Sequence, residues 1–166
     1  MPARSDKIAL VGITITVAVI DQLTKFLVVS TIGPGQLASR VDVVHGWLAL
    51  EYTENRGAAF GVLSGLGPIL AVASLAILMG LLLIYMRQPR PSPWQTVAIG
   101  LISGGALGNL CDRVRLGHVI DFLSIGPWPN FNIADSAITV GVLVLVWGLI
   151  RPTAAFDMAR ATDQGS

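Results

Sequence analysis

Two aspartates that lie 14 residues apart are the residues of this chain best suited to acid–base chemistry: Asp121 in GHVIDF and Asp135 in FNIADS. Two facing carboxylates can share a proton and together activate a water molecule for attack on a carbonyl group. A structural alternative stays open, because with Asn132 as the N-cap, Asp135 would be the third residue of a helix and a capping-box carboxylate. The pair would titrate jointly, so the sequence leaves open which carboxylate holds the proton.

Other polar residues in or beside apolar segments have structural explanations. Asp21 and Lys25 share a helix face at i and i+4, so the simplest interpretation is an ion pair facing a bundle interior. Asn55, in ENRGAAFG, is typical of a turn beside glycine. A further group stands where an apolar segment ends, and hydrogen bonding at a helix end explains it: Asn109, Asp112 and Arg113.

Several common kinds of site are excluded. One cysteine and two histidines are too few for a zinc site or an internal disulfide, and we expect no metal and no cofactor. The chain has no G-x-S-x-G, H-E-x-x-H or Walker sequence. Ser103 in GLISGG resembles the serine motif of rhomboid proteases, but the glycine is misplaced and no later span holds a histidine, so we assign Ser103 to packing. A net charge of +1 excludes a nucleic-acid partner.

The composition predicts a membrane protein, since 53% of the 166 residues are apolar and only 13% are charged. The predicted spans are residues 8–29, 66–86, 94–110 and 132–150, followed by a cytoplasmic tail over residues 151–166. Between the first two spans, residues 30–65 contain the near-alternating stretch RVDVVHGWLALEYT, which predicts a β region at the membrane interface. The expected fold is an all-α membrane protein of one domain, with four transmembrane helices and a small extracytoplasmic β region.

Glycines at four-residue spacing mark the third predicted span: Gly100, Gly104 and Gly108. A stripe of small residues lets another helix approach closely, so we interpret it as a packing surface inside the bundle.

The charges predict an orientation. An even number of spans places both termini on one side, and the basic residues that flank this side make it cytoplasmic by the positive-inside rule. Most acidic residues, Asp121 and Asp135 included, lie at or beyond the opposite ends of the spans. Carboxylate chemistry is therefore expected at the outer face.

Two other function classes remain open at this point. A proton-coupled exporter would use an acidic residue deep in a span. Its nearest candidate here is Asp21, which is already matched with Lys25 and lies toward the outer end. A purely structural membrane partner would use its polar residues only to join helices.

Five blocks occur in order along the chain: DQLTK (21–25), ENRGAAFG (54–61), GGALGNLCDR (104–113), GHVIDF (117–122) and FNIADSAITVG (131–141). Together they resemble the bacterial lipoprotein signal peptidase family, also called signal peptidase II. The resemblance implies an aspartyl endopeptidase whose catalytic pair is Asp121 and Asp135. It also implies residues that line or support the site: Asp21, Lys25, Asn55, Gly57, Asn109, Asp112, Arg113, Asn132 and Ala134.

The resemblance further implies a substrate and a location. The family removes signal peptides from prolipoproteins whose cysteine bears a diacylglyceryl group, and it cuts just before that cysteine. The implied location is the bacterial inner membrane, with the site near the periplasmic face and the acyl chains against a lipid-facing groove between helices. The family is the target of the cyclic peptide globomycin. We expect a monomer in contact with membrane lipids.

Overall fold

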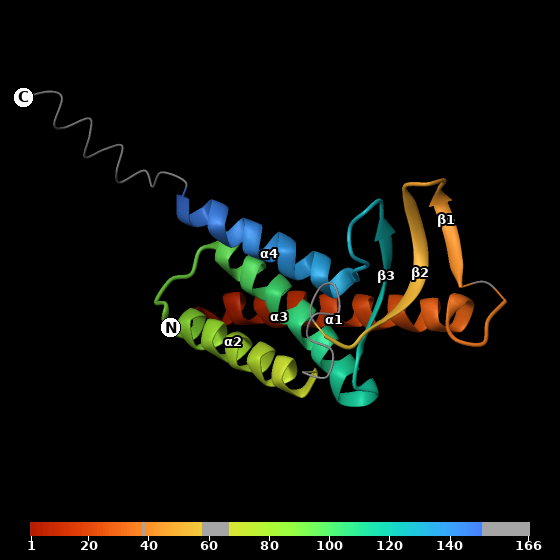
Figure 1. Cartoon of the computed structure of the whole chain (residues 1–166). Coiled ribbons are helices and arrows are strands. Elements are labelled where there is room, and N and C mark those ends of the chain that lie inside the picture. The colour runs from red at the N-terminus through yellow and green to blue at the C-terminus, as the bar shows by residue number, and fades with distance from the viewer. Residues whose placement is uncertain (38, 58–66, 151–166) are drawn as a thin grey trace, which may run out of the picture.

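The computed structural model describes residues 1–37, 39–57 and 67–150, which form four helices and one small sheet (Figure 1). The helices are α1 (Arg4–Ile32), α2 (Gly67–Arg87), α3 (Pro93–Leu116) and α4 (Ile133–Ile150). Among the described residues, three helices are long and apolar enough to cross a membrane: Arg4–Ile32, Pro68–Arg87 and Ile133–Ile150. These three agree with predicted spans. The predicted tail, residues 151–166, lies outside the described residues.

The central helix, α3, packs against the other three and ends later than predicted (Figure 1). It begins at Pro93 behind a capping box, in which the Ser92 backbone N–H donates to Gln95 Oε1 at 2.8 Å. It ends at Leu116 rather than at residue 110, where Gly117 adopts a left-handed φ of +77°. The helix thus continues past residue 110, where the predicted span ends, and Asp112 in this extension is buried inside the protein.

The glycine stripe of α3 is a close packing surface, and the helix packed on it is α1. A Cβ built on Gly104 would lie 2.6 Å from Val17 Cβ, which is closer than real atoms approach. A Cβ on Gly108 would lie 2.5 Å from Asp21 Oδ2, so the missing side chain makes room for a buried carboxylate. The spacing of small residues thus sets the distance between the two helices.

The sheet consists of three antiparallel strands in the order β1 (Arg40–Val44), β2 (Leu48–Asn55) and β3 (Val119–Ile125). The hairpin of β1 and β2 lies in the predicted β region between α1 and α2. The expectation that all β structure would lie there is wrong, since β3 joins α3 to α4. Its first four residues, Val119 to Phe122, are all buried, and a strand covered on both faces lacks the polar–apolar alternation that would predict it.

Two sets of contacts hold β3 against the bundle. Val28 and Ile32, in the last turns of α1, pack with Phe122. After β3 the chain turns back, so that the Phe131 N–H donates to the Leu123 carbonyl at 3.1 Å and the Phe131 carbonyl accepts from the Leu123 N–H at 2.8 Å. This return places the first turn of α4 beside β3.

A Gly104→Ala substitution tests the packing of α1 on α3. The added Cβ would meet Val17 Cβ and the Thr14 carbonyl oxygen, neither of which can rotate away, so the free energy of unfolding should fall by about 1–3 kcal/mol. Gly80→Ala in α2 is the matched control, because nothing lies within 4 Å of its Cβ position. Thermal unfolding in detergent measures both, and equal effects of the two substitutions would contradict the packing argument.

Candidate active site

The two aspartates singled out by the sequence lie in one hydrogen-bond network. Asp121 is on β3 and is 2% exposed, while Asp135 is in the first turn of α4. Asp121 Oδ1 accepts from Asn132 Nδ2 and Asp121 Oδ2 from Asn55 Nδ2, both at 2.8 Å. Asp135 Oδ1 accepts from Asn109 Nδ2 at 2.8 Å. Side-chain amides from three different parts of the chain therefore orient the two carboxylates.

Asn132 connects the two aspartates. It is fully buried, and its Oδ1 accepts from the Asp135 N–H at 2.8 Å, while its own N–H donates to Asp135 Oδ2 at 3.2 Å. This reciprocal pair is the capping box offered as the structural explanation of Asp135. The Asn132 side-chain amide also donates to Asp121, so the same residue that caps α4 binds the second carboxylate. The capping role and membership of an aspartate pair are thus compatible.

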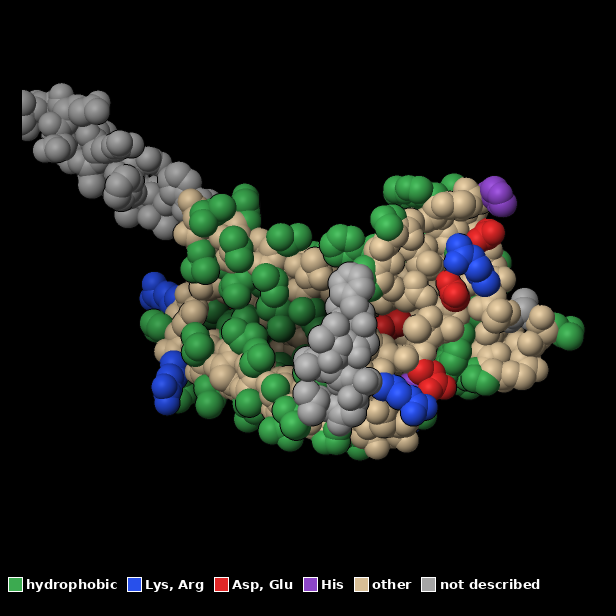
Figure 2. Space-filling view, viewed as in Figure 1, with side chains coloured by type: hydrophobic (Ala, Val, Ile, Leu, Met, Phe, Trp, Pro, Cys, Tyr) green, Lys and Arg blue, Asp and Glu red, His purple; other side chains and the backbone are tan. Residues whose placement is uncertain are grey.

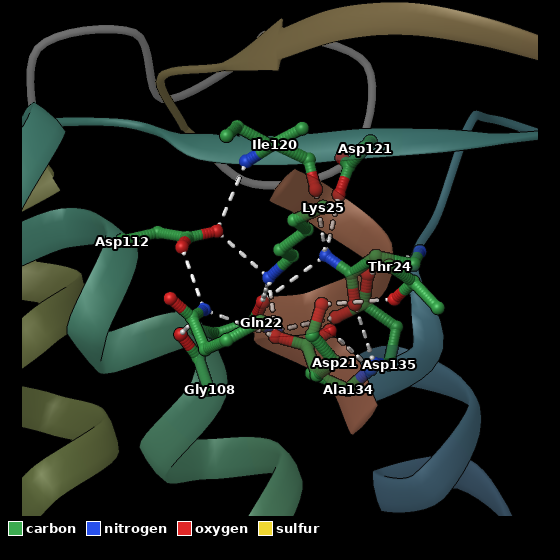
Figure 3. A network of polar contacts seen from close by, with 12 residues as sticks. Asp21, Gln22, Thr24, Lys25, Gly108, Asp112, Ile120, Asp121, Ala134 and Asp135 are labelled. Atoms are coloured by element: carbon green, nitrogen blue, oxygen red, sulfur yellow. Dashed lines mark hydrogen bonds and ion pairs between the residues drawn. The ribbon is translucent and has the colours of Figure 1, made fainter. Parts of the chain in front are cut away.

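A buried ion cluster lies beside the pair (Figure 3). Lys25 Nζ lies 2.8 Å from Asp21 Oδ2 and 2.7 Å from Asp112 Oδ2, and it donates to Asn109 Oδ1 at 3.0 Å. The side chains of Lys25, Asp21 and Asp112 are each 2% exposed or less. The ion pair predicted between Asp21 and Lys25 is present, and Asp112 joins it.

The cluster also binds the backbone of both elements that bear the aspartates (Figure 3). Asp21 Oδ1 accepts from the Ala134 N–H at 2.9 Å, in the first turn of α4. Asp112 Oδ2 accepts from the Ile120 N–H at 3.2 Å, next to Asp121 in β3. An acid at a helix N-terminus is stabilised by the free N–H groups there. The ion cluster therefore fixes β3 and α4 relative to α1 and α3.

Burial changes the ionisation of Asp121. It raises the pKa of this carboxyl from its ordinary value of 3.8 to about 7. The Asn55 hydrogen bond and the Lys25 charge lower the pKa, and the charge of Asp135 raises it further. Asp121 can therefore hold or release a proton near neutral pH. A carboxyl with such a pKa suits acid–base chemistry.

Two further site residues expected from the sequence, Asn55 and Arg113, differ in their relation to the aspartates. Asn55 is at once a turn residue and a ligand of Asp121, because its Oδ1 accepts from the Gly57 N–H at 3.1 Å. Arg113 donates to the Asn109 carbonyl one turn earlier, at 3.4 Å, and the described part of the chain shows no bond from it to either aspartate. The helix-end explanation holds for Arg113, which lies in the last turn of α3 and whose carbonyl accepts from the Gly117 N–H. It is wrong for Asn109 and Asp112, which lie before that turn.

Sequence reasoning missed Gln22. Its Nε2 donates to Asp112 Oδ1 at 2.9 Å and to the Gly108 carbonyl at 3.2 Å, and its Oε1 accepts from Arg115 at 3.2 Å. The sequence did carry a signal for Gln22, because it is a polar residue directly after Asp21 in an otherwise apolar segment. No group of three or more His, Cys, Asp or Glu side chains within the described residues is arranged to hold a metal ion.

Residues 13–151 match the family model described as signal peptidase (SPase) II. The chain belongs to the signal peptidase II family. Relatives named lipoprotein signal peptidase include one from Syntrophomonas wolfei, 41% identical over 135 residues, which cover 81% of this chain and 88% of the relative. Another, from Symbiobacterium thermophilum, is 42% identical over 145 residues, which cover 83% of this chain and 91% of the relative.

Two solved structures, each described as a bacterial membrane enzyme, share the fold of this signal peptidase II family member. Both superpose with a TM-score of 0.76. One is 33% identical and covers 85% of this chain and 87% of its own; the other is 34% identical and covers 87% and 94%. At this identity and coverage the likeness extends over most of the chain.

Lys25→Met tests the ion cluster of this signal peptidase II family member. The substitution leaves Asp21 and Asp112 as uncompensated buried charges, so the free energy of unfolding should fall by about 3–5 kcal/mol. Arg40→Met is the matched control: Arg40 also bonds two acids but is 45% exposed, so water screens these ion pairs and its loss should change the stability little. Chemical unfolding in one detergent compares the two, and a small loss for Lys25→Met would refute the supporting role.

Proposed function

We propose that this chain is a membrane aspartyl endopeptidase that removes the signal peptide from diacylglyceryl-modified prolipoproteins. It cuts the peptide bond just before the lipidated cysteine and uses Asp121 and Asp135 to activate water. Membership of the signal peptidase II family and the names of the relatives support the reaction and the substrate. The single observation that supports the mechanism is that a buried carboxylate on β3 and a half-buried one on α4 are bound through one asparagine.

The hydrogen bonds suggest how the two aspartates divide the work. With a pKa of about 7, Asp121 is protonated in about half of the molecules at neutral pH, and the protonated form donates its proton to the carbonyl oxygen of the scissile bond. Asp135 accepts hydrogen bonds from Asn109 Nδ2 and the Asn132 N–H in the first turn of α4, and these two bonds fix the orientation of its carboxyl group. Asp135 removes the proton from the attacking water. The tetrahedral intermediate then collapses, and no covalent enzyme intermediate forms.

The same proposal includes four membrane spans: the three apolar helices α1, α2 and α4, and α3 in addition. The rise of an α-helix makes its 24 residues about 36 Å long, enough to cross hydrocarbon, and it packs against all three apolar helices. Its glycines and four of its polar side chains are buried in the protein, so the surface that they form need not be apolar: Thr96, Ser103, Asn109 and Asp112. Both termini would then be cytoplasmic in the bacterial inner membrane, and the chain would act as a monomer.

The distribution of charge supports this orientation. On the face drawn in Figure 2, hydrophobic side chains cover the helices, the charged side chains visible at the end away from the sheet are basic, and the visible acidic ones gather at the sheet end. Asp6, in the first turn of α1, is an acidic residue at the opposite end from the sheet. The basic end corresponds to the cytoplasmic side under the positive-inside rule. The aspartates would then lie at the periplasmic side, where a substrate held in the bilayer presents the bond that follows its signal helix.

Substitution of either aspartate tests the catalytic pair. Purified Asp121→Asn and Asp135→Asn proteins should each lose cleavage of a diacylglyceryl-modified precursor by about 10³-fold or more, because each removes one of the two proton-transfer groups. Asp42→Asn is the matched control, since Asp42 is an exposed acid on β1 that bonds Arg40. Mass spectrometry locates the cut. A folded variant of the pair that still cleaves at the wild-type rate would refute the assignment.

The pH dependence provides a second test. Above about pH 7 the pair loses the proton of Asp121, so kcat/KM should fall about tenfold per pH unit. Stability should fall between about pH 4 and 7, because the folded state holds a proton that the unfolded chain releases, and it should level off above that range. Asp121→Asn should remove that fall in stability. A pH–rate profile and thermal unfolding at each pH measure the two effects; a rate that stays constant from roughly pH 6 to 9 would contradict the proposal.

A further inference from the structure

The tip of the sheet holds an apolar pocket that the proposed mechanism does not use. It has a volume of about 400 Å³ and is lined by Trp47, Ile125, Gly126, Pro127, Trp128 and Phe131. None of these residues is charged. Trp47 is 65% exposed and Trp128 is 70% exposed, so two indole rings stand at the surface beside the opening. A pocket of this size and composition suits an apolar ligand.

Backbone hydrogen bonds join the walls of the pocket. The Gly126 N–H donates to the Trp47 carbonyl at 2.9 Å, which ties the end of β3 to the turn between β1 and β2. The Trp128 N–H donates to the Ile125 carbonyl at 3.0 Å, and Gly126 supplies the left-handed φ of +49° that this turn needs. The Phe131 backbone pairs with β3. The pocket is therefore formed before any ligand arrives, which reduces the entropy lost on binding.

The pocket lies next to the proposed active site and near the level where the hydrocarbon begins. Phe131 directly precedes Asn132, whose side chain binds Asp121. One residue later α4 starts, and α4 is apolar enough to cross a membrane. Figure 1 shows the tips of β2 and β3 projecting past the first turn of α4, on the side away from α2. An apolar chain could thus enter the pocket from the bilayer. Tryptophan is the residue enriched at this depth.

We propose that this pocket binds one acyl chain of the substrate's diacylglyceryl group, an inference that rests on the proposed function. The lipid is attached to the cysteine that follows the scissile bond, so its chains start close to the two aspartates when that bond is positioned for cleavage. The sequence led us to expect these chains in a groove between helices; the pocket gives one of them a defined, protein-lined place. The bound chain then holds the lipidated cysteine in register with Asp121 and Asp135.

Two lipopeptide precursors that differ only in acyl length test this inference: one with two palmitoyl chains and one with two butyryl chains. Trp128→Ala removes part of the pocket wall and should raise KM for the dipalmitoyl precursor about tenfold, leave kcat within about twofold, and leave KM for the dibutyryl precursor unchanged. Trp128→Phe keeps an aromatic wall and should restore the wild-type KM. Val43→Ala is the control, because Val43 is 56% exposed on β1 and does not line the pocket.

The outcomes separate this inference from the proposed function. An equal rise in KM for both precursors, or a matching rise in Val43→Ala, would show that the sheet tip contacts bulk lipid and would overturn the pocket assignment. No change in Trp128→Ala would also overturn it, while cleavage of both precursors by the wild-type protein would leave the peptidase proposal standing. A folded wild-type protein that cleaves neither precursor would overturn both.

Discussion

A lysine ammonium group buried between two carboxylates is the interaction on which the rest of this structure depends. Lys25 Nζ lies 2.8 Å from Asp21 and 2.7 Å from Asp112, and all three side chains are almost completely removed from solvent. Buried charges are tolerated only when their partners are in place. The other contacts of the two carboxylates reach the backbone of α4 and β3. The ion cluster therefore couples the packing of the bundle to the position of Asp121 and Asp135.

Asn132 also has two roles, since it caps α4 and binds Asp121. A helix N-terminus needs acceptors for its first N–H groups, and Asn132 and Asp135 supply them reciprocally. The amide group that remains on Asn132 is then free to bind Asp121. A capping interaction of ordinary type thus brings a second carboxylate to the first turn of α4. Burial in this protein-lined site, more than the charge of the neighbouring Asp135, raises the pKa of Asp121 to about 7.

Predictions from the sequence succeeded where the signal is local. The apolar runs over residues 8–29, 66–86 and 132–150 correspond to α1, α2 and α4, because a bilayer selects apolar helices regardless of which helices surround them. The end of α3 and the strand β3 were not predictable in this way. A charged residue such as Asp112 marks the end of a membrane helix only if it faces water. Here Asp112 instead forms a buried ion pair with Lys25. β3 shows no alternation because both of its faces are covered.

By itself, the sequence determined the apolar helices, the close-packing glycine face of α3 and the presence of two aspartates that flank the start of α4, since these follow from composition and short-range spacing. Only the tertiary structure decided which groups surround those aspartates. Asn55, Asn109 and Asn132 come from β2, α3 and the N-cap of α4, and no local pattern brings them together. The neutral-range pKa of Asp121 likewise depends on burial, which the whole fold creates and no short stretch of sequence contains.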